Sequence, residues 1–284
     1  MSAPPLTRLV DERRVSLVRD AAAVRQVLDD DPVGSCMVAS RVAEHGVEPS
    51  AVGGELWTRR RAEESLCYAG ANLIPLRGEP GDLYAFADKA VNSARRCSSL
   101  VGRAELVLPM WRRLEDAWGP ARDVRERQPL MALSTAPDCP IDPAVRPVRI
   151  DELDAYLVAA VDMFIGEVGI DPRIGDGGRG YRRRVAGLIA AGRAWARFER
   201  GQVVFKAEIG SQSPAVGQIQ GVWVRPDRRG HGMGTAGTAA LAAAVVRSGR
   251  IASLYVNSFN TVARATYNRI GFTEVGNFAT ILLD

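Results

Sequence analysis

Apolar and polar residues follow helical and strand periodicities in turn along the second half of the chain. Apolar positions at helical spacing predict helices over residues 150–169, 181–191, 235–248 and 261–270. Alternating patterns and short apolar runs predict strands over residues 194–199, 202–210, 216–224, 252–259 and 277–283. Gly192, Gly249 and Gly271 follow three of the helices and favour helix ends there. The order ααβββαβαβ is typical of a mixed α/β domain.

The first half shows a weaker version of the same order. Strands are predicted over residues 55–61, 65–76, 98–102 and 128–134, with helices over 83–96 and 104–118. The segments Ile74–Leu133 and Val222–Leu282 are each about sixty residues long and share the order β-turn-α-β-α-β. We therefore expect a degenerate internal repeat.

A proline-rich stretch separates the two halves. Ser134 to Arg149 contains four prolines and no periodic apolar pattern, which is typical of a linker. We expect an N-terminal α/β domain over residues 1–134, a linker over 135–145 and a second domain over 146–284. A length of 284 residues suits two domains of about 140 residues each.

Composition and charge narrow the class of protein. A hydrophobic content of 46% is enough for two cores, and the net charge of +4 is mild. Arginines alternate with acids, so most predict solvated faces and not a nucleic-acid track. No apolar run approaches the ~18 residues of a membrane helix, and the first residues lack the apolar segment of a secretory signal. We expect a cytoplasmic protein without nucleic-acid or membrane partners.

Cysteines and histidines give no sign of a metal site. The four cysteines stand about thirty or more residues apart, and neither their spacing nor that of the two histidines fits zinc ligation or redox chemistry. We expect reduced thiols and no bound metal.

Glycines are concentrated in "RRGHGMGTAG", residues 228–237, directly before a predicted helix. A P-loop requires a Gly-Lys-Ser/Thr ending, which is absent. Gly232, Gly234 and Gly237 match a dinucleotide fingerprint, but no acidic residue lies between Asp227 and Glu274 to bind a ribose. Amides at a helix N-terminus bind anions, and glycines let phosphates approach the backbone. The segment therefore predicts a phosphate site of another kind.

Two motifs together resemble the GNAT superfamily of acyl-CoA-dependent N-acyltransferases. Arg229, Gly232 and Gly234 match its pyrophosphate loop, Arg/Gln-x-x-Gly-x-Gly/Ala. "NTVARATYNRIGF" matches its second signature through Asn260, Ala263, Tyr267, Gly271 and Phe272. The spacing predicts that Asn260 caps a helix, that Ala263 and Tyr267 share a face, and that Gly271 ends the helix. The resemblance covers residues 146–284.

The resemblance implies a fold and a cofactor site. The fold would be α/β, with a central, mostly antiparallel, splayed sheet flanked by helices. Acetyl-CoA would be the co-substrate, with pantetheine in the gap between the strands that contain Val224 and Tyr255. The expected cofactor-binding residues are Val222, Trp223, Val224, Arg229, Gly230, His231, Gly232, Met233, Gly234, Thr235, Asn257, Asn260, Ala263 and Tyr267.

The resemblance also implies catalytic roles. The amide of Val224 would polarise the thioester carbonyl, and Tyr267 would face the sulfur. A tyrosine pKa of ~10 exceeds a thiol pKa of ~8.5, so we expect Tyr267 to donate a hydrogen bond to the thiolate and not to transfer its proton fully. A carboxylate would deprotonate the amine. Glu208 is the first candidate and Glu167 the second, because the strand before the loop offers only Gln218 and Gln220, where this family often has a base.

The first half lacks this chemistry. Where the repeat would place the phosphate loop stands "PLRGEPGD", in which Glu79 and Asp82 would repel phosphate and Pro80 removes an amide. We expect a non-catalytic, GNAT-like domain that helps to shape the acceptor site. This arrangement resembles two-domain actinobacterial acetyltransferases whose N-terminal region has no assigned function. The whole is expected to transfer an acetyl group to a primary amine of a small molecule or protein, by direct attack in a ternary complex. The alternative is an acyl-CoA-binding sensor without turnover. Acceptor, acyl length and oligomeric state stay open.

Overall fold

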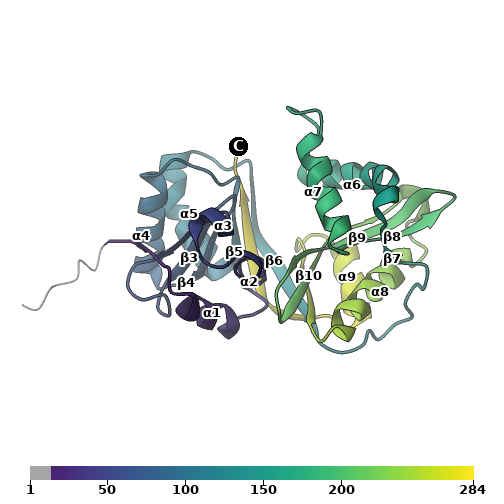
Figure 1. Ribbon diagram of the computed structural model, residues 1–284, viewed down its shortest axis with the longest axis horizontal. Helices are drawn as coiled ribbons and strands as arrows, with labels where there is room; N and C mark the ends of the chain where they lie inside the picture. Colours follow the sequence, from purple (N-terminus) through teal and green to yellow (C-terminus); the bar gives the residue numbers. More distant parts are fainter. Residues whose placement is uncertain (1–13) are drawn as a thin grey trace, which may run out of the picture. The chain divides into compact units, whose positions relative to one another are not determined.

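The computed structural model describes residues 14–284, and its contacts divide them into two units (Figure 1). Unit 1 comprises the described residues up to Arg127 together with Asn277–Asp284, and unit 2 comprises Gln128–Gly276. Residues 1–13, where the sequence predicts no secretory signal, lie outside the described residues.

Unit 1 has a sheet in the order β1-β2-β3-β4-β5-β12. Its strands are β1 (Ser16–Leu17), β2 (Gly54–Thr58), β3 (Leu66–Gly70), β4 (Leu73–Arg77), β5 (Ser99–Arg103) and the end of β12 (Thr273–Leu282). Its helices are α1 (Ala21–Asp30), α2 (Cys36–His45), α3 (Pro49–Val52), α4 (Pro80–Val91) and α5 (Ala104–Trp118). The sequence pattern predicted no elements before residue 55 and so missed α1 to α3.

Unit 2 has a sheet in the order β6-β11-β10-β9-β8-β7. Its strands are the end of β6 (Asp123–Leu133), β7 (Arg146–Pro147), β8 (Ala194–Glu199), β9 (Gln202–Gln212), β10 (Val216–Val224) and β11 (Ile251–Tyr255). Its helices are α6 (Leu153–Val168), α7 (Arg179–Ala190), α8 (Met233–Arg247) and α9 (Thr261–Ile270), with short 3-10 turns at Ile150–Glu152 and Pro226–Arg228. The elements predicted for residues 150–270 are confirmed.

The expected internal repeat is present as a repeat of topology. The order β4-α4-β5-α5-β6 returns as β10-α8-β11-α9-β12. In each copy the first helix connects two parallel strands, since β4 pairs in parallel with β5, and β10 with β11. A parallel pair needs such a crossover, whereas the strand before each copy pairs antiparallel through a hairpin, β3 with β4 and β9 with β10.

The last strand of each repeat completes the other unit. Residues 278–282 of β12 pair with 99–103 of β5 in unit 1, and residues 130–133 of β6 pair with 252–255 of β11 in unit 2. The connection after β6 is ordered on unit 2, because the amide of Asp138 donates to the carbonyl of Ile270 and that of Asp142 to Ala236. The spatial division thus differs from a division by chain order, because β6 and β12 each begin in one unit and end in the other.

Both faces of the unit 2 sheet are covered by helices. The α8–α9 cluster packs on one face and includes Phe205, Ile219, Leu241, Leu254, Tyr267 and Ile270. The α6–α7 cluster packs on the other and includes Tyr156, Tyr181, Val185, Ala194 and Val203. Adjacent side chains of a strand point to opposite faces; accordingly Val222 and Val224 contact the α8–α9 cluster and Trp223 the α6–α7 cluster. The end of β10 therefore lies between the two helical layers.

Candidate functional site

The gap predicted between β10 and β11 is present in unit 2. The two strands pair in parallel from Val216 with Ile251 to Gln218 with Ser253, and the pairing stops there. β10 continues to Val224 along β9, with Trp223 opposite Lys206 and Val224 opposite Phe205. The edge of β10 that faces β11 is therefore unpaired over the end of the strand.

Backbone alternation orients the amides along this edge. The amide of Arg225 donates to the carbonyl of Val204 on β9 at 3.0 Å. Because successive amides of a strand point to opposite edges, the amide of Val224 points into the gap. This is the direction required of the oxyanion donor that the resemblance assigns to Val224.

The glycine segment ends at the first turn of α8. Gly232 is the N-cap residue with φ +79, and the first turn after it contains no acidic residue. The first backbone hydrogen bond of the helix is donated by Ala236 to Gly232 at 3.0 Å. The amides of Met233, Gly234 and Thr235 precede it and have no acceptor within the helix, as at any helix start. They form an open group of donors at the positive end of the dipole.

Arg229 and His231 hold the loop that leads into α8. Arg229 Nε donates to the carbonyl of Val224 at 3.0 Å, and His231 Nδ1 lies 2.7 Å from the carbonyl oxygen of Arg229. Both side chains are exposed. The Arg229 guanidinium thus fastens the loop to the end of β10, and its remaining N–H groups can still face an anion.

Helix α9 has the ends that the second motif predicts. Asn260 is the N-cap residue, and its Oδ1 accepts a hydrogen bond from the amide of Ala263 at 3.1 Å. Gly271 ends the helix with φ +104, a left-handed conformation that glycine adopts without strain. Asn257, just after β11, accepts a hydrogen bond from Gln128 Nε2 at 2.8 Å.

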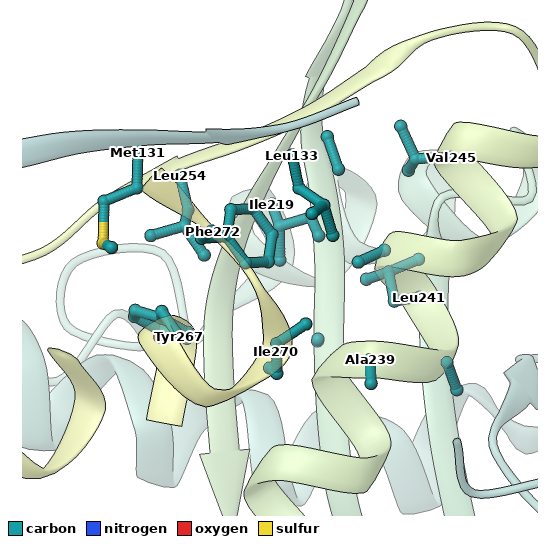
Figure 2. Packing of buried hydrophobic residues seen from close by; sticks show 14 of the residues in the cluster. Met131, Leu133, Ile219, Ala239, Leu241, Val245, Leu254, Tyr267, Ile270 and Phe272 are labelled. Atoms are coloured by element: carbon teal, nitrogen blue, oxygen red, sulfur yellow. The ribbon is translucent and has the colours of Figure 1, made fainter. Parts of the chain in front are cut away.

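Tyr267 belongs to the buried cluster against which several of the predicted cofactor residues pack. Figure 2 shows it projecting from α9 into the α8–α9 cluster, against which Val222, Val224, Met233 and Ala263 also pack. Its ring contacts Phe272 edge-on at a centroid distance of 6.1 Å. Within residues 14–284 no acceptor forms a hydrogen bond with the Tyr267 hydroxyl. The hydroxyl is therefore available to a ligand in the gap.

The two candidate bases have different surroundings. Burial raises the pKa of Tyr267, and the charge of Glu167 raises it further, so the Glu167 carboxylate acts on this hydroxyl. Glu167 itself is exposed near the end of α6. Glu208 is 1% exposed and accepts hydrogen bonds from Lys206 Nζ at 2.7 Å and from the Tyr156 hydroxyl at 3.1 Å. Burial alone would raise the pKa of Glu208, but Lys206, Arg184 and Tyr156 outweigh it, and the pKa lies below its usual value.

The equivalent position in unit 1 is occupied by its own side chains. Helix α4 begins with Pro80 after the N-cap residue Glu79, and Asp82 Oδ2 accepts a hydrogen bond from the amide of Glu79 at 3.0 Å. Asp82 is fully buried and also pairs with Arg59 at 3.3 Å and Arg60 at 3.0 Å. A carboxylate thus takes the place in which a phosphate would bind.

Two family models match separate parts of the sequence. The family model described as FR47-like protein matches residues 206–280, and that described as Domain of unknown function (DUF4081) matches residues 54–156. Among curated proteins, none matches the sequence.

Several solved structures match the fold over nearly the whole chain. A GNAT-family acetyltransferase from Colwellia psychrerythraea has a TM-score of 0.57 at 13% identity, and the match covers 95% of this chain and 100% of that one. A Drosophila protein has a TM-score of 0.66 at 12% identity, covering 95% and 98%. A GCN5-related N-acetyltransferase from Kribbella flavida has a TM-score of 0.53 at 14% identity, covering 93% and 96%.

These matches extend across both units, and both sequence signatures lie in unit 2 on the elements that their spacing predicts. The chain has the GNAT fold. The fold was predicted correctly, with a splayed sheet in the second half and a GNAT-like region before it.

Two features near the gap between β10 and β11 have no counterpart among the sequence predictions. A bulge in β10 places Gly221, with φ +58, over the Lys206–Glu208 pair. A cavity of about 540 Å³ is lined by Arg197, Glu199, Arg200, Gln202, Arg225 and Arg228. Three of its four arginines are paired, since Arg197 contacts Asp142, Arg225 contacts Asp227 and Arg228 contacts Glu199. The basic cluster "RPDRR" is its one signal in the sequence.

Within residues 14–284 the structure contains no group of three or more His, Cys, Asp and Glu side chains that could hold a metal ion. Nor does the described part of the chain contain a helix long and apolar enough to cross a membrane. Cys36, Cys67, Cys97 and Cys139 form no disulfide.

Proposed function

We propose that this GNAT protein is an acyl-CoA-dependent N-acyltransferase, which transfers an acetyl group to a primary amine by direct attack in a ternary complex. The observation that carries the proposal is the juxtaposition of open amides at the start of α8 with the unpaired edge of β10. The amides of Met233, Gly234 and Thr235 would hold the pyrophosphate of coenzyme A. The pantetheine, bound along the β10 edge, would then lead from the pyrophosphate past Val224 to Tyr267.

Acyl-CoA supplies the activated thioester, and the residues of the chain supply the remaining parts of the reaction. The Val224 amide would donate to the carbonyl oxygen as negative charge develops there. The amine nitrogen forms a bond to the carbonyl carbon while the carbon–sulfur bond breaks. The Tyr267 hydroxyl would donate to the leaving thiolate, which is stabilised without full proton transfer.

Glu167 is our candidate for the base. A lysine-like amine of pKa ~10.4 is neutral at pH 7 only at a cost of roughly 4–5 kcal/mol, and a carboxylate within reach of it directly or through water lowers this barrier. Glu167 is exposed and acts electrostatically on Tyr267. Glu208 is buried in an ion pair with Lys206, which opposes a role as base. On this basis Glu167→Gln should remove the acidic limb of the kcat profile.

The test incubates the full chain with acetyl-CoA and a panel of primary amines while free thiol is followed. The proposal expects amine-dependent thiol release, with a mass increase of the acceptor by one acetyl group. The alternative, an acyl-CoA-binding sensor, expects tight binding of CoA without thiol release on any amine. The acceptor, whether a small molecule or a protein amine, would be identified by the amine that gives the highest kcat/KM.

A further inference from the structure

A charged pair is fully buried beneath the end of β10. Lys206 is 0% and Glu208 1% exposed, and Lys206 Nζ donates to Glu208 Oε1 at 2.7 Å. The Tyr156 hydroxyl donates to the same oxygen at 3.1 Å, and Lys206 Nζ lies 5.3 Å from the centroid of the Tyr156 ring. Neither charged residue reaches solvent, so the pair has another role than surface solubility.

The pair lies against the irregular part of β10. Gln220 is paired with Glu208 and Trp223 with Lys206, so Gly221 and Val222 together oppose the single residue Ala207. This is a β-bulge, which adds a residue to one strand and re-aims the residues after it. Lys206 and Glu208 are two apart on β9 and therefore point to the same face. They flank the bulge on both sides.

Gly221 forms the contact between the bulge and the pair. A Cβ atom at Gly221 would lie 3.1 Å from Lys206 Nζ, 3.7 Å from Glu208 Cδ and 3.0 Å from Met163 Cε. The φ of +58 also favours glycine there. The backbone of the bulge thus lies directly on the ion pair, with no side chain between them.

The pair contributes more to geometry than to stability. Removing two charges from water costs about as much as their mutual attraction returns, so apolar replacement of a buried pair is often neutral. The bulge, however, decides which way the next amides point. A slip of one residue exchanges both faces and both edges of a strand. After such a slip the Val224 amide would point to β9 and not into the gap.

We propose that Lys206 and Glu208, oriented by Tyr156, are positioning residues that hold the Gly221–Val222 bulge and so aim the Val224 amide at the acyl group. The inference rests on the proposed function. It gives Glu208 a role other than the base expected from the sequence. It concerns orientation of the acyl carbonyl and not binding of the pyrophosphate, which occurs at the start of α8.

The test compares the double variant Lys206→Met/Glu208→Leu with wild type in three measurements: the melting temperature, the Kd for CoA, and kcat for acetyl-CoA with the best amine. We expect the double variant to melt near wild type and to bind CoA within about threefold, while kcat falls about tenfold or more because the carbonyl is misaligned. The single variant Lys206→Arg, which keeps the positive charge, should lose less kcat than the double variant. Arg113→Ala/Asp88→Ala, which removes an exposed pair of unit 1, is the matched control and should leave all three unchanged.

Glu208→Gln keeps a similar shape and tests the inference even if the double variant does not fold. Its amide oxygen can still accept from Lys206 and Tyr156, so kcat should fall less than about tenfold. A loss of a hundredfold or more with unchanged CoA binding would make Glu208 a base and overturn the inference. So would wild-type kcat in the double variant, or equal losses of CoA binding and kcat. Wild-type protein without thiol release would overturn the proposed function and this inference together, whereas active wild type with a fully active double variant overturns the inference alone.

Discussion

Helices α4 and α8 begin at equivalent positions of the repeat, and their N-terminal amides have opposite surroundings. Helix α4 starts at Pro80 and places the buried Asp82 carboxylate on its own N-terminal amide, with Arg59 and Arg60 against it. Helix α8 starts after Gly232 with no acid in its first turn. Both solutions satisfy the positive end of a helix. At α4 the Asp82 carboxylate supplies the negative charge from within the fold, whereas at α8 the amides stay open to a ligand.

The difference shows that topology alone does not decide whether a helix start in this fold is open to an anion. Both units have a parallel β-α-β unit with the helix start at the same place. What separates them is a few side chains: Glu79, Pro80 and Asp82 in unit 1, and Gly232 and Gly234 in unit 2. Substitutions at these positions can therefore break or sharpen the comparison.

The largest effect is expected in unit 1. Asp82→Asn would leave Arg59 and Arg60 without their buried partner and should lower the free energy of unfolding by about 3 kcal/mol. Denaturant titration measures the loss. Asp88→Asn, at an exposed ion pair of the same helix, is the control and should cost less than about 1 kcal/mol. Equal effects of the two substitutions would contradict a structural role for Asp82.

Next comes the reverse change in unit 2. A Cβ at Gly234 would meet its nearest atom, Val224 Cγ2, at 3.5 Å, an ordinary contact, so Gly234→Asp fits the fold. Its carboxylate would take the anion site, and affinity for CoA should fall at least about a hundredfold, or ~2.7 kcal/mol. The melting temperature should stay the same or rise, because an acid in the first turn stabilises a helix. Gly234→Ala is the matched control for size, and an equal loss with it would refute the electrostatic explanation. Calorimetric titration gives both affinities.

A smaller effect is expected at Tyr267, which belongs to a signature that does not recur in the repeat of unit 1. Tyr267→Phe removes the hydroxyl and keeps the ring against Phe272. We expect kcat to fall about tenfold to a hundredfold, since a hydrogen bond to a charged group contributes ~1.5–3 kcal/mol. The Kd for CoA should not change. Unchanged turnover in steady-state kinetics would exclude a role for this hydroxyl.

The smallest effect concerns pH. Burial raises the pKa of Tyr267 above its usual value of 10.0, and Glu167 adds to the rise. The hydroxyl therefore stays protonated and able to donate up to that pH, and kcat should show no alkaline limb from Tyr267 below about pH 10. A pH–rate profile checks this. A limb below that pH in wild type that disappears in Tyr267→Phe would mean that the hydroxyl is more acidic than its burial implies.

The sequence predicted the elements of unit 2 because the physical causes there are local. Glycines at helix ends, the cap at Asn260 and the alternation along β10 all act within a few residues. Helices α1 and α2 escaped prediction although each is ten residues long and α1 has buried residues at helical spacing, Val24, Val27 and Leu28. Helix α3 is only four residues long. The exchange of β6 and β12 also escaped it, since an apolar strand carries no mark of which sheet it joins.

The residues that surround Glu208 could not be predicted from the sequence, because they come together through long-range contacts. Lys206 lies two residues away on the same strand and could be anticipated as a partner. Tyr156 comes from α6, and the bulge at Gly221 comes from β10, so the buried network follows only from the assembled sheet. In the sequence, Glu167 is a candidate base because it lies near the expected substrate loop. The fold adds that its charge raises the pKa of Tyr267.

The central claim is that the open start of α8 holds the pyrophosphate of coenzyme A. A crystal structure of the wild-type chain with CoA tests it most directly. We expect the pyrophosphate oxygens within hydrogen-bond distance, about 2.7–3.2 Å, of the amides of Met233, Gly234 and Thr235. Pyrophosphate bound instead in the arginine-lined cavity beside Arg200 and Arg228, with those amides facing only water, would contradict it.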